Sequence, residues 1–206
     1  MTTNVAYVLA TNSIFVNAGN FGTASLAGDH NGFWNTLSNI GGSTFSASSS
    51  PFAASPFVYA GTASGGGYYF LSDESTFSGV ANNGFDPSVY ADIAEKTTQR
   101  PIYVATVTNN YILGPQVVTN DENLGYHYYR MDYILSATTV RTNLNFAAGT
   151  VVAWFGQGAS VNSGSTVNFL GTASNPCYFV RGNTVDEMDF IGDGTGIINS
   201  TNGSTP

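Results

Sequence analysis

The sequence has few charged side chains, and no basic one precedes Lys96. Charged residues make up 9% of the chain, against ~25% in typical soluble domains, and the formal net charge is −8. Because nucleic-acid binding needs clustered Lys and Arg side chains, this composition argues against it. Asn, Ser and Thr supply 65 of the 206 residues. Their short polar side chains bond to nearby backbone groups, which favours turns and strands over helices.

Cysteine is limited to Cys177, which excludes an intramolecular disulfide and a cysteine-based zinc cluster. We expect this thiol to be a small buried side chain in a strand. Long apolar runs are also missing, since none reaches the ~18 residues of a membrane span. The segment 1–16 lacks a basic start, and Thr11, Asn12 and Ser13 interrupt its apolar run. We therefore expect no signal peptide and no membrane partner.

Short runs rich in Val, Ile, Tyr, Phe and Thr alternate with clusters of Gly, Asn and Ser, a pattern typical of strands joined by turns. The pattern predicts an all-β fold, an antiparallel β-sandwich or jelly-roll-like domain over 1–195, with a polar tail at 196–206. The predicted strands are 5–9, 13–16, 57–60, 68–71, 102–108, 111–118, 126–140, 151–155, 166–170 and 177–181.

Two local signals add detail to this prediction. Asn109–Asn110 separates two strand-like runs, and Asn tolerates the positive φ of a tight turn, so 102–118 is predicted to be a hairpin. Near 87–97 the sequence predicts one short helix, because Asp86 can cap it and Pro87 suits the first helical position.

The tetrapeptide Gly-Thr-Ala-Ser occurs three times, beginning at Gly22, Gly61 and Gly171. The second interval is far longer than the first, so no constant period indicates a solenoid or a propeller. The copies follow Asn20–Phe21, 58–60 and Phe169–Leu170. We interpret each as a strand end followed by a tight turn, in which Gly permits unusual φ values and Thr or Ser bonds the backbone.

The most aromatic segment is 124–140. With a period of two, both of its faces are largely apolar or amphipathic, which predicts a strand between two layers or at a subunit contact. The alternative is that its rings stack on a ligand. The candidate interface or stacking residues are Tyr126, Tyr128, Tyr129, Tyr133, Trp34 and Trp154.

Candidates for catalysis are few. Only His30 and His127 could act as an imidazole base, and no Ser lies in a Gly-x-Ser-x-Gly turn. We expect both histidines to be hydrogen-bonded or solvated side chains. The acidic residues fall into no recognisable catalytic context, so we expect a protein that is not an enzyme.

The densest charge lies in DEMDFIGDG, near the C-terminus. Carboxylates are ligands that Ca²⁺ prefers, although the spacing differs from that of an EF-hand loop. The alternative is a solvated acidic loop, and no other cofactor is expected. The calcium candidates are Asp186, Glu187, Asp189 and Asp193.

The strand-and-turn texture, abundant Asn, Ser, Thr, Gly, Tyr and Phe, single Lys and leaderless Met1 together resemble structural proteins of virus particles. The resemblance is to capsid decoration, fibre and tail components of bacteriophages, and it extends over the whole chain. It implies a non-enzymatic, β-rich homo-oligomer located in the virion. Its partners would be further copies and other virion proteins.

A second interpretation is an extracellular carbohydrate-binding or adhesin-like β-sandwich module. Rings would then stack on a cell-surface glycan, and Asn or Asp side chains would bind its hydroxyl groups. The aromatic residues available for this are Trp34, Tyr68, Tyr69, Trp154 and the run 126–133.

Overall fold

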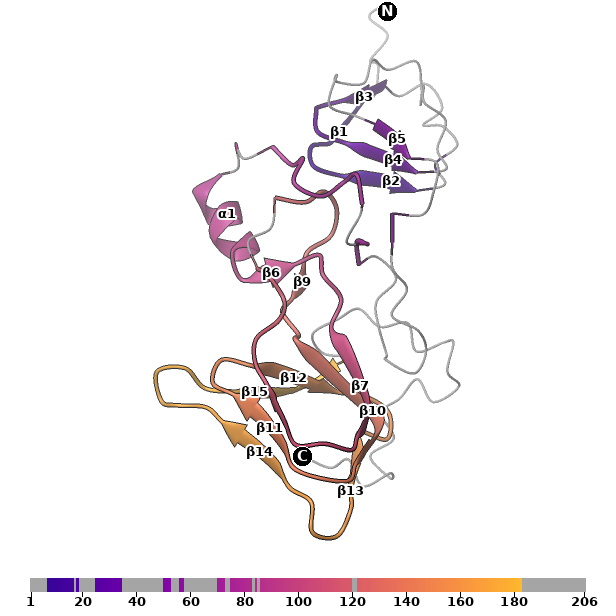
Figure 1. Cartoon of the computed structure of the whole chain (residues 1–206). Coiled ribbons are helices and arrows are strands. Elements are labelled where there is room, and N and C mark those ends of the chain that lie inside the picture. The colour runs from indigo at the N-terminus through magenta and orange to yellow at the C-terminus, as the bar shows by residue number, and fades with distance from the viewer. Residues whose placement is uncertain are drawn as a thin grey trace, which may run out of the picture. The chain divides into compact units, whose positions relative to one another are not determined.

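The computed structural model describes residues 7–16, 18, 25–34, 50–52, 56–57, 70–72, 75–82, 84, 86–119 and 122–182. The chain divides into two compact units (Figure 1). Unit 1 comprises Met1–Val58, Leu71–Thr98 and Asn120–His127, and unit 2 comprises Tyr59–Phe70, Gln99–Thr119 and Tyr128–Pro206. The single domain predicted for 1–195 stays a prediction, and each unit is described by itself.

Unit 2 is built from short strands joined by corners. Its strands are β7 (Ile102–Val107), β8 (Tyr111–Leu113), β9 (Tyr128–Tyr129), β10 (Tyr133–Val140), β11 (Leu144–Ala147), β12 (Val151–Trp154), β13 (Ala159–Val161), β14 (Val167–Leu170) and β15 (Tyr178–Arg181). Strands β12, β14 and β15 fall inside the predicted runs 151–155, 166–170 and 177–181. Local composition therefore predicted these three strands, whereas β11 and β13 fall outside every predicted run.

The pairing of these strands shows a three-sided parallel β-helix. Strands β7, β10, β12 and β15 pair in parallel on the first face. On the second face the end of β10 pairs with the end of β7 and with β13, and β8, β11 and β14 form the third face. Each strand thus pairs with its equivalent in the next coil. The register partners are Ile102–Tyr133–Val152–Phe179, Val107–Val140–Val161 and Leu113–Phe146–Phe169.

The predicted antiparallel sandwich or jelly roll is therefore wrong. Strands β7 and β8 do not form the predicted hairpin, because they lie on different faces of one coil and each pairs with the following coil. Asn110 instead belongs to a corner, where its side-chain oxygen accepts a hydrogen bond from the Asn143 backbone N–H of the next coil at 3.1 Å. A turn-forming Asn pair predicts a change of direction but does not distinguish a hairpin from a coil corner.

The interior of the β-helix is filled by stacked apolar side chains. Phe146 is fully buried, and its ring lies 5.2 Å from Phe169 and 5.9 Å from Tyr133, centroid to centroid. Leu144, Val140 and other side chains pack in the same cluster. Burial of apolar area at roughly 25 cal/mol per Å² makes this column the main stabilising feature of unit 2.

Strand β10 is buried on both sides, as predicted for a strand between two layers. Tyr133 and Leu135 face the interior cluster, whereas Ile134 packs in a second cluster with Met131. The strand bends between Leu135 and Thr139, where its register shifts.

The bend in β10 lets one strand contribute to two faces of the coil. Ala137 adopts φ 51° there, a left-handed conformation that costs ~1–2 kcal/mol for a residue with a Cβ. The hydroxyl of Thr138 accepts the backbone N–H of Ser136 at 3.1 Å and donates to the Val104 carbonyl, which stabilises the bend.

Unit 1 also contains parallel strands in a coil-like order. Its strands are β1 (Tyr7–Leu9), β2 (Ile14–Val16), β3 (Ser25–Ala27), β4 (Gly32–Trp34), β5 (Ser50–Phe52) and β6 (Lys96–Thr97). Strand β1 pairs with β3, and β4 pairs with β2 and β5, all in parallel. Ile14, Gly32 and Ser50 are register partners at equal intervals along the sequence, so successive coils have the same length. The inference from Gly-Thr-Ala-Ser spacing that the chain has no solenoid repeat is therefore wrong.

A buried asparagine organises the corner of this coil. Asn31 is 2% exposed; its Nδ2 donates to the Ala10 carbonyl at 2.8 Å, and its Oδ1 accepts the Ser13 backbone N–H at 3.0 Å. Asn12 and His30, which precede β2 and β4, both have positive φ, 55° and 50°. The residues at this corner thus have the same positive-φ conformation in consecutive coils.

The predicted helix is present as α1 (Pro87–Ile93), and it ends before the predicted Thr97. Asp86 is its N-cap, and the Asp86 carboxylate accepts the Ser88 backbone N–H at 2.9 Å, an orphan donor of the first turn. The hydrogen bond from the Ser88 hydroxyl, together with this one, lowers the pKa of Asp86. The residues after α1 enter β6 instead of extending the helix.

The Gly-Thr-Ala-Ser copy at Gly171 follows β14 and forms a tight turn as predicted, but Gly171 is not among the described glycines with positive φ, so the predicted reason for the glycine is wrong. Thr172 and Asn175 exchange backbone hydrogen bonds of 3.0 and 3.2 Å, and the Thr172 hydroxyl accepts the Asn175 N–H at 3.0 Å. A Cβ at Gly171 would lie 2.4 Å from the Cys177 backbone nitrogen, so glycine is required for close approach. The copy at Gly61 lies outside the described residues, as do Gly22, Thr23 and Ala24 of the first copy.

Candidate functional site

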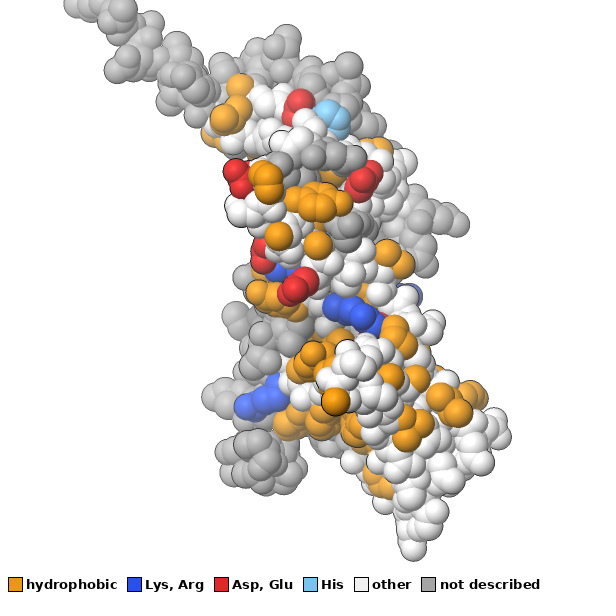
Figure 2. Space-filling model, turned by 90° about the vertical axis from the view of Figure 1, so that its left-hand side faces the viewer, with side chains coloured by type: hydrophobic (Ala, Val, Ile, Leu, Met, Phe, Trp, Pro, Cys, Tyr) orange, Lys and Arg blue, Asp and Glu red, His pale blue; other side chains and the backbone are white. Residues whose placement is uncertain are grey.

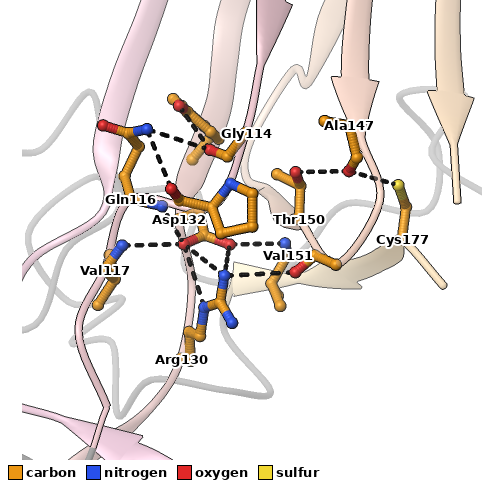
Figure 3. A network of polar contacts seen from close by, with 12 residues as sticks. Gly114, Gln116, Val117, Arg130, Asp132, Ala147, Thr150, Val151 and Cys177 are labelled. Carbon is orange, nitrogen blue, oxygen red and sulfur yellow. Dashed lines mark hydrogen bonds and ion pairs between the residues drawn. The ribbon is translucent and has the colours of Figure 1, made fainter. Parts of the chain in front are cut away.

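The most extensive polar cluster among the described residues of unit 2 surrounds Asp132, which is fully buried just before β10 (Figure 3). Its Oδ1 accepts the backbone N–H groups of Gln116 at 2.8 Å and Val117 at 3.0 Å, and its Oδ2 accepts the Val151 N–H at 2.8 Å. The Arg130 guanidinium bonds both oxygens, at distances from 2.8 to 3.1 Å. We call Asp132 and Arg130 the carboxylate clasp.

The carboxylate clasp connects consecutive coils. The Asp132 backbone N–H donates to the Val151 carbonyl at 2.9 Å, and its carbonyl accepts the Ile102 N–H at 2.9 Å. Its side chain meanwhile satisfies backbone donors of the segment after β8 and of β12. A buried backbone donor without a partner costs free energy, so the clasp stabilises the corner between the third and first faces.

All hydrogen-bond acceptor sites of the carboxylate in the clasp are occupied. A carboxylate offers about four lone-pair sites, and three backbone N–H groups and a guanidinium already occupy them. Arg130 also donates to the Gly149 carbonyl at 3.3 Å. This arrangement suits a structural role, because the carboxylate has no acceptor site left for a substrate proton.

Polar side chains next to the clasp also bond to backbone oxygens. The Tyr133 hydroxyl donates to the Gly114 carbonyl at 2.9 Å, and burial together with the Asp132 carboxylate raises the pKa of Tyr133. The Thr150 hydroxyl and the Cys177 thiol both donate to the Ala147 carbonyl, at 2.7 and 3.0 Å (Figure 3). Cys177 is partly buried and packs against the interior cluster.

The carboxylate clasp was not predicted from the sequence. Arg130 and Asp132 were expected on one face of a continuous strand, whereas β9 ends at Tyr129 and β10 begins at Tyr133. A signal was nevertheless present in the sequence, since Asp132 is the single acidic residue between Glu122 and Asp186. An isolated carboxylate in an apolar aromatic segment is rarely buried without a partner.

The predicted aromatic candidates are divided between the two units. Trp34 packs edge-on against Phe57 within unit 1, with 6.0 Å between ring centroids. Tyr128 is buried against Phe70 at 4.4 Å, and Tyr133 belongs to the interior cluster. These rings have packing roles.

The remaining candidates are more accessible. Tyr126 belongs to unit 1 and Tyr129 to unit 2, and both are exposed. Trp154 lies under the Arg181 guanidinium, whose carbon is 5.6 Å from the ring centroid, a cation–π geometry. Tyr68 and Tyr69 lie outside the described residues.

The two histidines sit in different surroundings within unit 1. The His30 Nδ1 lies 3.4 Å from the Asp29 carboxylate, and the His127 Nδ1 lies 3.2 Å from the Gly125 carbonyl. Both contacts are with sequence neighbours. His127, which falls within the predicted strand 126–140, lies before the start of β9.

The calcium candidates Asp186, Glu187, Asp189 and Asp193 lie outside the described residues. Within the part of the chain that the structure describes, no three His, Cys, Asp or Glu side chains come together as metal ligands would. Likewise, no helix in the described ranges is long and apolar enough to cross a membrane.

Large exposed apolar side chains gather on the strands of unit 2. Among them are Ile112, which is 71% exposed, and Phe179, which is 55% exposed. Figure 2 shows hydrophobic side chains spread over the lower part of the face in view, among white atoms that belong to the backbone and to other side chains. The exposed set comprises Ile102, Tyr103, Tyr111, Ile112, Val118, Tyr129, Val161, Phe169, Leu170, Tyr178 and Phe179.

Charge is divided unequally between the units. The described residues of unit 2 contain four Arg and Asp132, whereas the sequence of unit 1 contains eight acidic residues and Lys96. Four more acidic residues follow in 183–206. The acidic residues look scattered along the sequence, so this division of charge between the units was not predicted.

Comparison of the chain with protein-family models, with curated proteins and with solved structures found no match. The functional assignment therefore depends on the geometry described above.

Proposed function

We propose that this chain is a non-enzymatic structural protein of a virus particle, which acts through self-assembly and contacts with other proteins of the particle. The observation that carries the proposal is the set of exposed apolar side chains on the coil strands of unit 2. Large exposed apolar side chains are typical of protein–protein contact sites where they adjoin one another, as the rings of Phe169 and Phe179 do, with 5.4 Å between their centroids. The composition resembling that of virion structural proteins supports the same assignment.

The polar chemistry of the site also favours a contact function. The carboxylate clasp uses its oxygens to hold backbone N–H groups, and the Thr150 and Tyr133 hydroxyls bond to carbonyls. These groups stabilise a stack of coils. A stacked, regular scaffold with apolar surface strands suits repeated protein contacts.

Carbohydrate binding has less support. Of the rings considered for sugar stacking, Tyr128 and Tyr133 are buried and Trp34 packs on Phe57. Stacking on a sugar needs an accessible ring face, so the buried rings of Tyr128 and Tyr133 cannot serve.

The proposal is tested by the protein composition of particles. Particles from a culture that expresses this gene would be purified on a density gradient, and their proteins quantified by mass spectrometry. We expect this chain to co-sediment with the particles in many copies per particle. Recovery of the chain only from soluble fractions that lack particles would contradict the proposal, and a known non-structural protein of the same genome is the control.

A further inference from the structure

Asn31 is followed by Gly32, and Asn-Gly is the dipeptide in which an asparagine side chain deamidates most readily. The glycine lacks a Cβ, so its backbone nitrogen can approach the side-chain amide carbon of the asparagine without a steric clash. The sequence contains three such dipeptides, which begin at Asn31, Asn83 and Asn202. The first lies wholly within the described residues, so the surroundings of its reacting atoms are known.

The packing of unit 1 requires both residues of this dipeptide. The Asn31 side chain donates to the Ala10 carbonyl and accepts the Ser13 backbone N–H, so the corner needs a side chain with both a donor and an acceptor. A Cβ on Gly32 would lie 2.7 Å from the ring of Phe77, which is 1% exposed. Because a close-packed ring has little room to move, the next position needs a glycine. The corner therefore contains a reactive dipeptide as a consequence of its packing.

The same contacts keep the reacting groups apart. Deamidation begins when the Gly32 backbone nitrogen attacks the Asn31 Cγ, so the nitrogen must be free and the side chain must turn towards it. In the folded chain the Gly32 N–H donates to the Ser13 carbonyl at 2.8 Å. The Asn31 Oδ1 and Nδ2 are held by two different residues, at 3.0 and 2.8 Å, and the side chain is 2% exposed. These three hydrogen bonds must break before the two atoms can reach a reactive geometry.

We infer that Asn31 is a modification site that the fold protects, and that opening of the corner around it allows an irreversible deamidation. This inference is independent of the proposed function. In the reaction, the Gly32 nitrogen gives up its proton and bonds to Cγ, the Cγ–Nδ2 bond breaks, and ammonia leaves with that proton. Water then opens the resulting five-membered ring at either carbonyl and leaves aspartate or isoaspartate at position 31. Nothing is oxidised or reduced.

Neither product fits the corner. The carboxylate of an aspartate has only acceptors, so it would place an oxygen against the Ala10 carbonyl, to which the Asn31 Nδ2 donates in the native chain. An isoaspartate adds a carbon to the backbone, which displaces Gly32 from its register with Ile14. A chain that reacts while the corner is open should therefore not close it again, since chemical modification of an unfolded state makes unfolding irreversible.

The test measures deamidation in the full chain, folded and unfolded. The protein is held at mildly alkaline pH in buffer or in guanidinium chloride and then digested with pepsin at acid pH, and mass spectrometry quantifies the peptides that contain Asn31 and Asn202. In guanidinium both should deamidate at similar rates, because local sequence alone acts there. In buffer Asn31 should react at least about tenfold more slowly than in guanidinium, since three hydrogen bonds oppose the reaction. Equal rates for Asn31 in the two solutions would overturn the inference.

Two glycine variants test whether this corner provides the protection. In Gly28→Ala the new Cβ would lie 1.8 Å from the oxygen of Ala10, the residue whose carbonyl accepts the Asn31 amide. In buffer this variant should deamidate at Asn31 at least about tenfold faster than the wild type. Gly79→Ala is the matched control, because it changes another positive-φ glycine that has open space around it, and it should react at the wild-type rate.

A folded Gly28→Ala variant that reacts at the wild-type rate would overturn the role of the corner. If circular dichroism shows that this variant is unfolded, the wild type in rising guanidinium concentrations below its unfolding transition replaces it. The rate at Asn31 should then rise as the corner opens more often, and a rate that does not change until the whole protein unfolds would overturn local control by the corner.

Asn31→Asp tests the consequence of the reaction directly. Its free energy of unfolding in urea should be clearly lower than that of the wild type, because two acceptors then face each other in a buried site. Asn109→Asp is the control, since Asn109 is exposed in a corner of unit 2, and it should unfold close to the wild type. An Asn31→Asp protein as stable as Asn109→Asp would overturn the irreversibility.

Discussion

The side-chain amide of Asn168 donates a hydrogen bond of 2.8 Å to the amide oxygen of Asn145, its register partner in the preceding coil. The Asn145 amide in turn donates to the Tyr111 carbonyl at 3.2 Å. The third face of the β-helix thus carries stacked amides that join three consecutive coils. The polar contact between these two coils is thus made by two identical, uncharged side chains that are register partners.

Replacement of both residues in the variant Asn145→Asp/Asn168→Asp should destabilise unit 2 by more than the sum of the single changes. Two carboxylates would face each other at neutral pH and repel, as like charges do across paired strands. Urea unfolding of the four proteins gives the coupling free energy. The coupling should disappear near pH 3, where both carboxyls become protonated; a coupling that persists there would contradict a charge effect.

Asp132→Asn should destabilise the protein by about 3–5 kcal/mol, because the change removes one partner of a buried ion pair. In either orientation of the new amide, its NH₂ group would also lie against a backbone N–H group that donates to the carboxylate in the wild type, so two donors would face each other. Asp92→Asn is the matched control, since Asp92 is exposed and pairs with Lys96 at 2.6 Å beyond the helix end, an interaction worth about 0.5 kcal/mol or less. Chemical denaturation compares the two, and equal losses would contradict a special role for the clasp.

Gly28→Ala should destabilise unit 1 far more than Gly79→Ala. Both glycines have positive φ, 114° and 69°, so both changes add backbone strain. Only at Gly28 would the new Cβ collide, at 1.8 Å from the Ala10 carbonyl oxygen, whereas Gly79 has open space around it. We expect about 1–2 kcal/mol for Gly79→Ala and a larger loss for Gly28→Ala, measured by thermal unfolding; similar losses would show that the corner relaxes.

Some of the extended segments and the helix start could be predicted from the sequence, because they depend on local composition and capping; strands such as β4, β11 and β13 were missed. Runs such as 151–155 and 166–170 became β12 and β14, and Asp86 caps α1 as expected. Strand partners could not be predicted in the same way. Composition does not distinguish a strand that pairs with its neighbour in sequence from one that pairs with the next coil.

Uneven coil length hides the repeat in unit 2. The register partners Ile102, Tyr133, Val152 and Phe179 are unequally spaced along the sequence, because corners of different length join the strands. In unit 1 the spacing is constant, and comparison of 14–16 with 32–34 could have shown it. The exact tetrapeptide Gly-Thr-Ala-Ser does not reveal such a repeat. What recurs from coil to coil is a pattern of apolar residues and a corner conformation.

Alkaline pH should weaken the protein partly through Tyr133. Its pKa is raised in the folded state by burial and by the Asp132 carboxylate, above the value of about 10 for an unfolded chain. The neutral phenol is therefore favoured by folding, so its contribution is complete below about pH 10 and is lost as pH rises through the raised pKa. Tyr133→Phe should show a smaller fall in unfolding free energy between about pH 9 and pH 11 than the wild type, even though it loses the bond to Gly114 at all pH values. Tyr178→Phe, which alters an exposed ring of β15, is the control and should keep the wild-type slope; a wild-type slope in Tyr133→Phe would assign the alkaline loss to other groups.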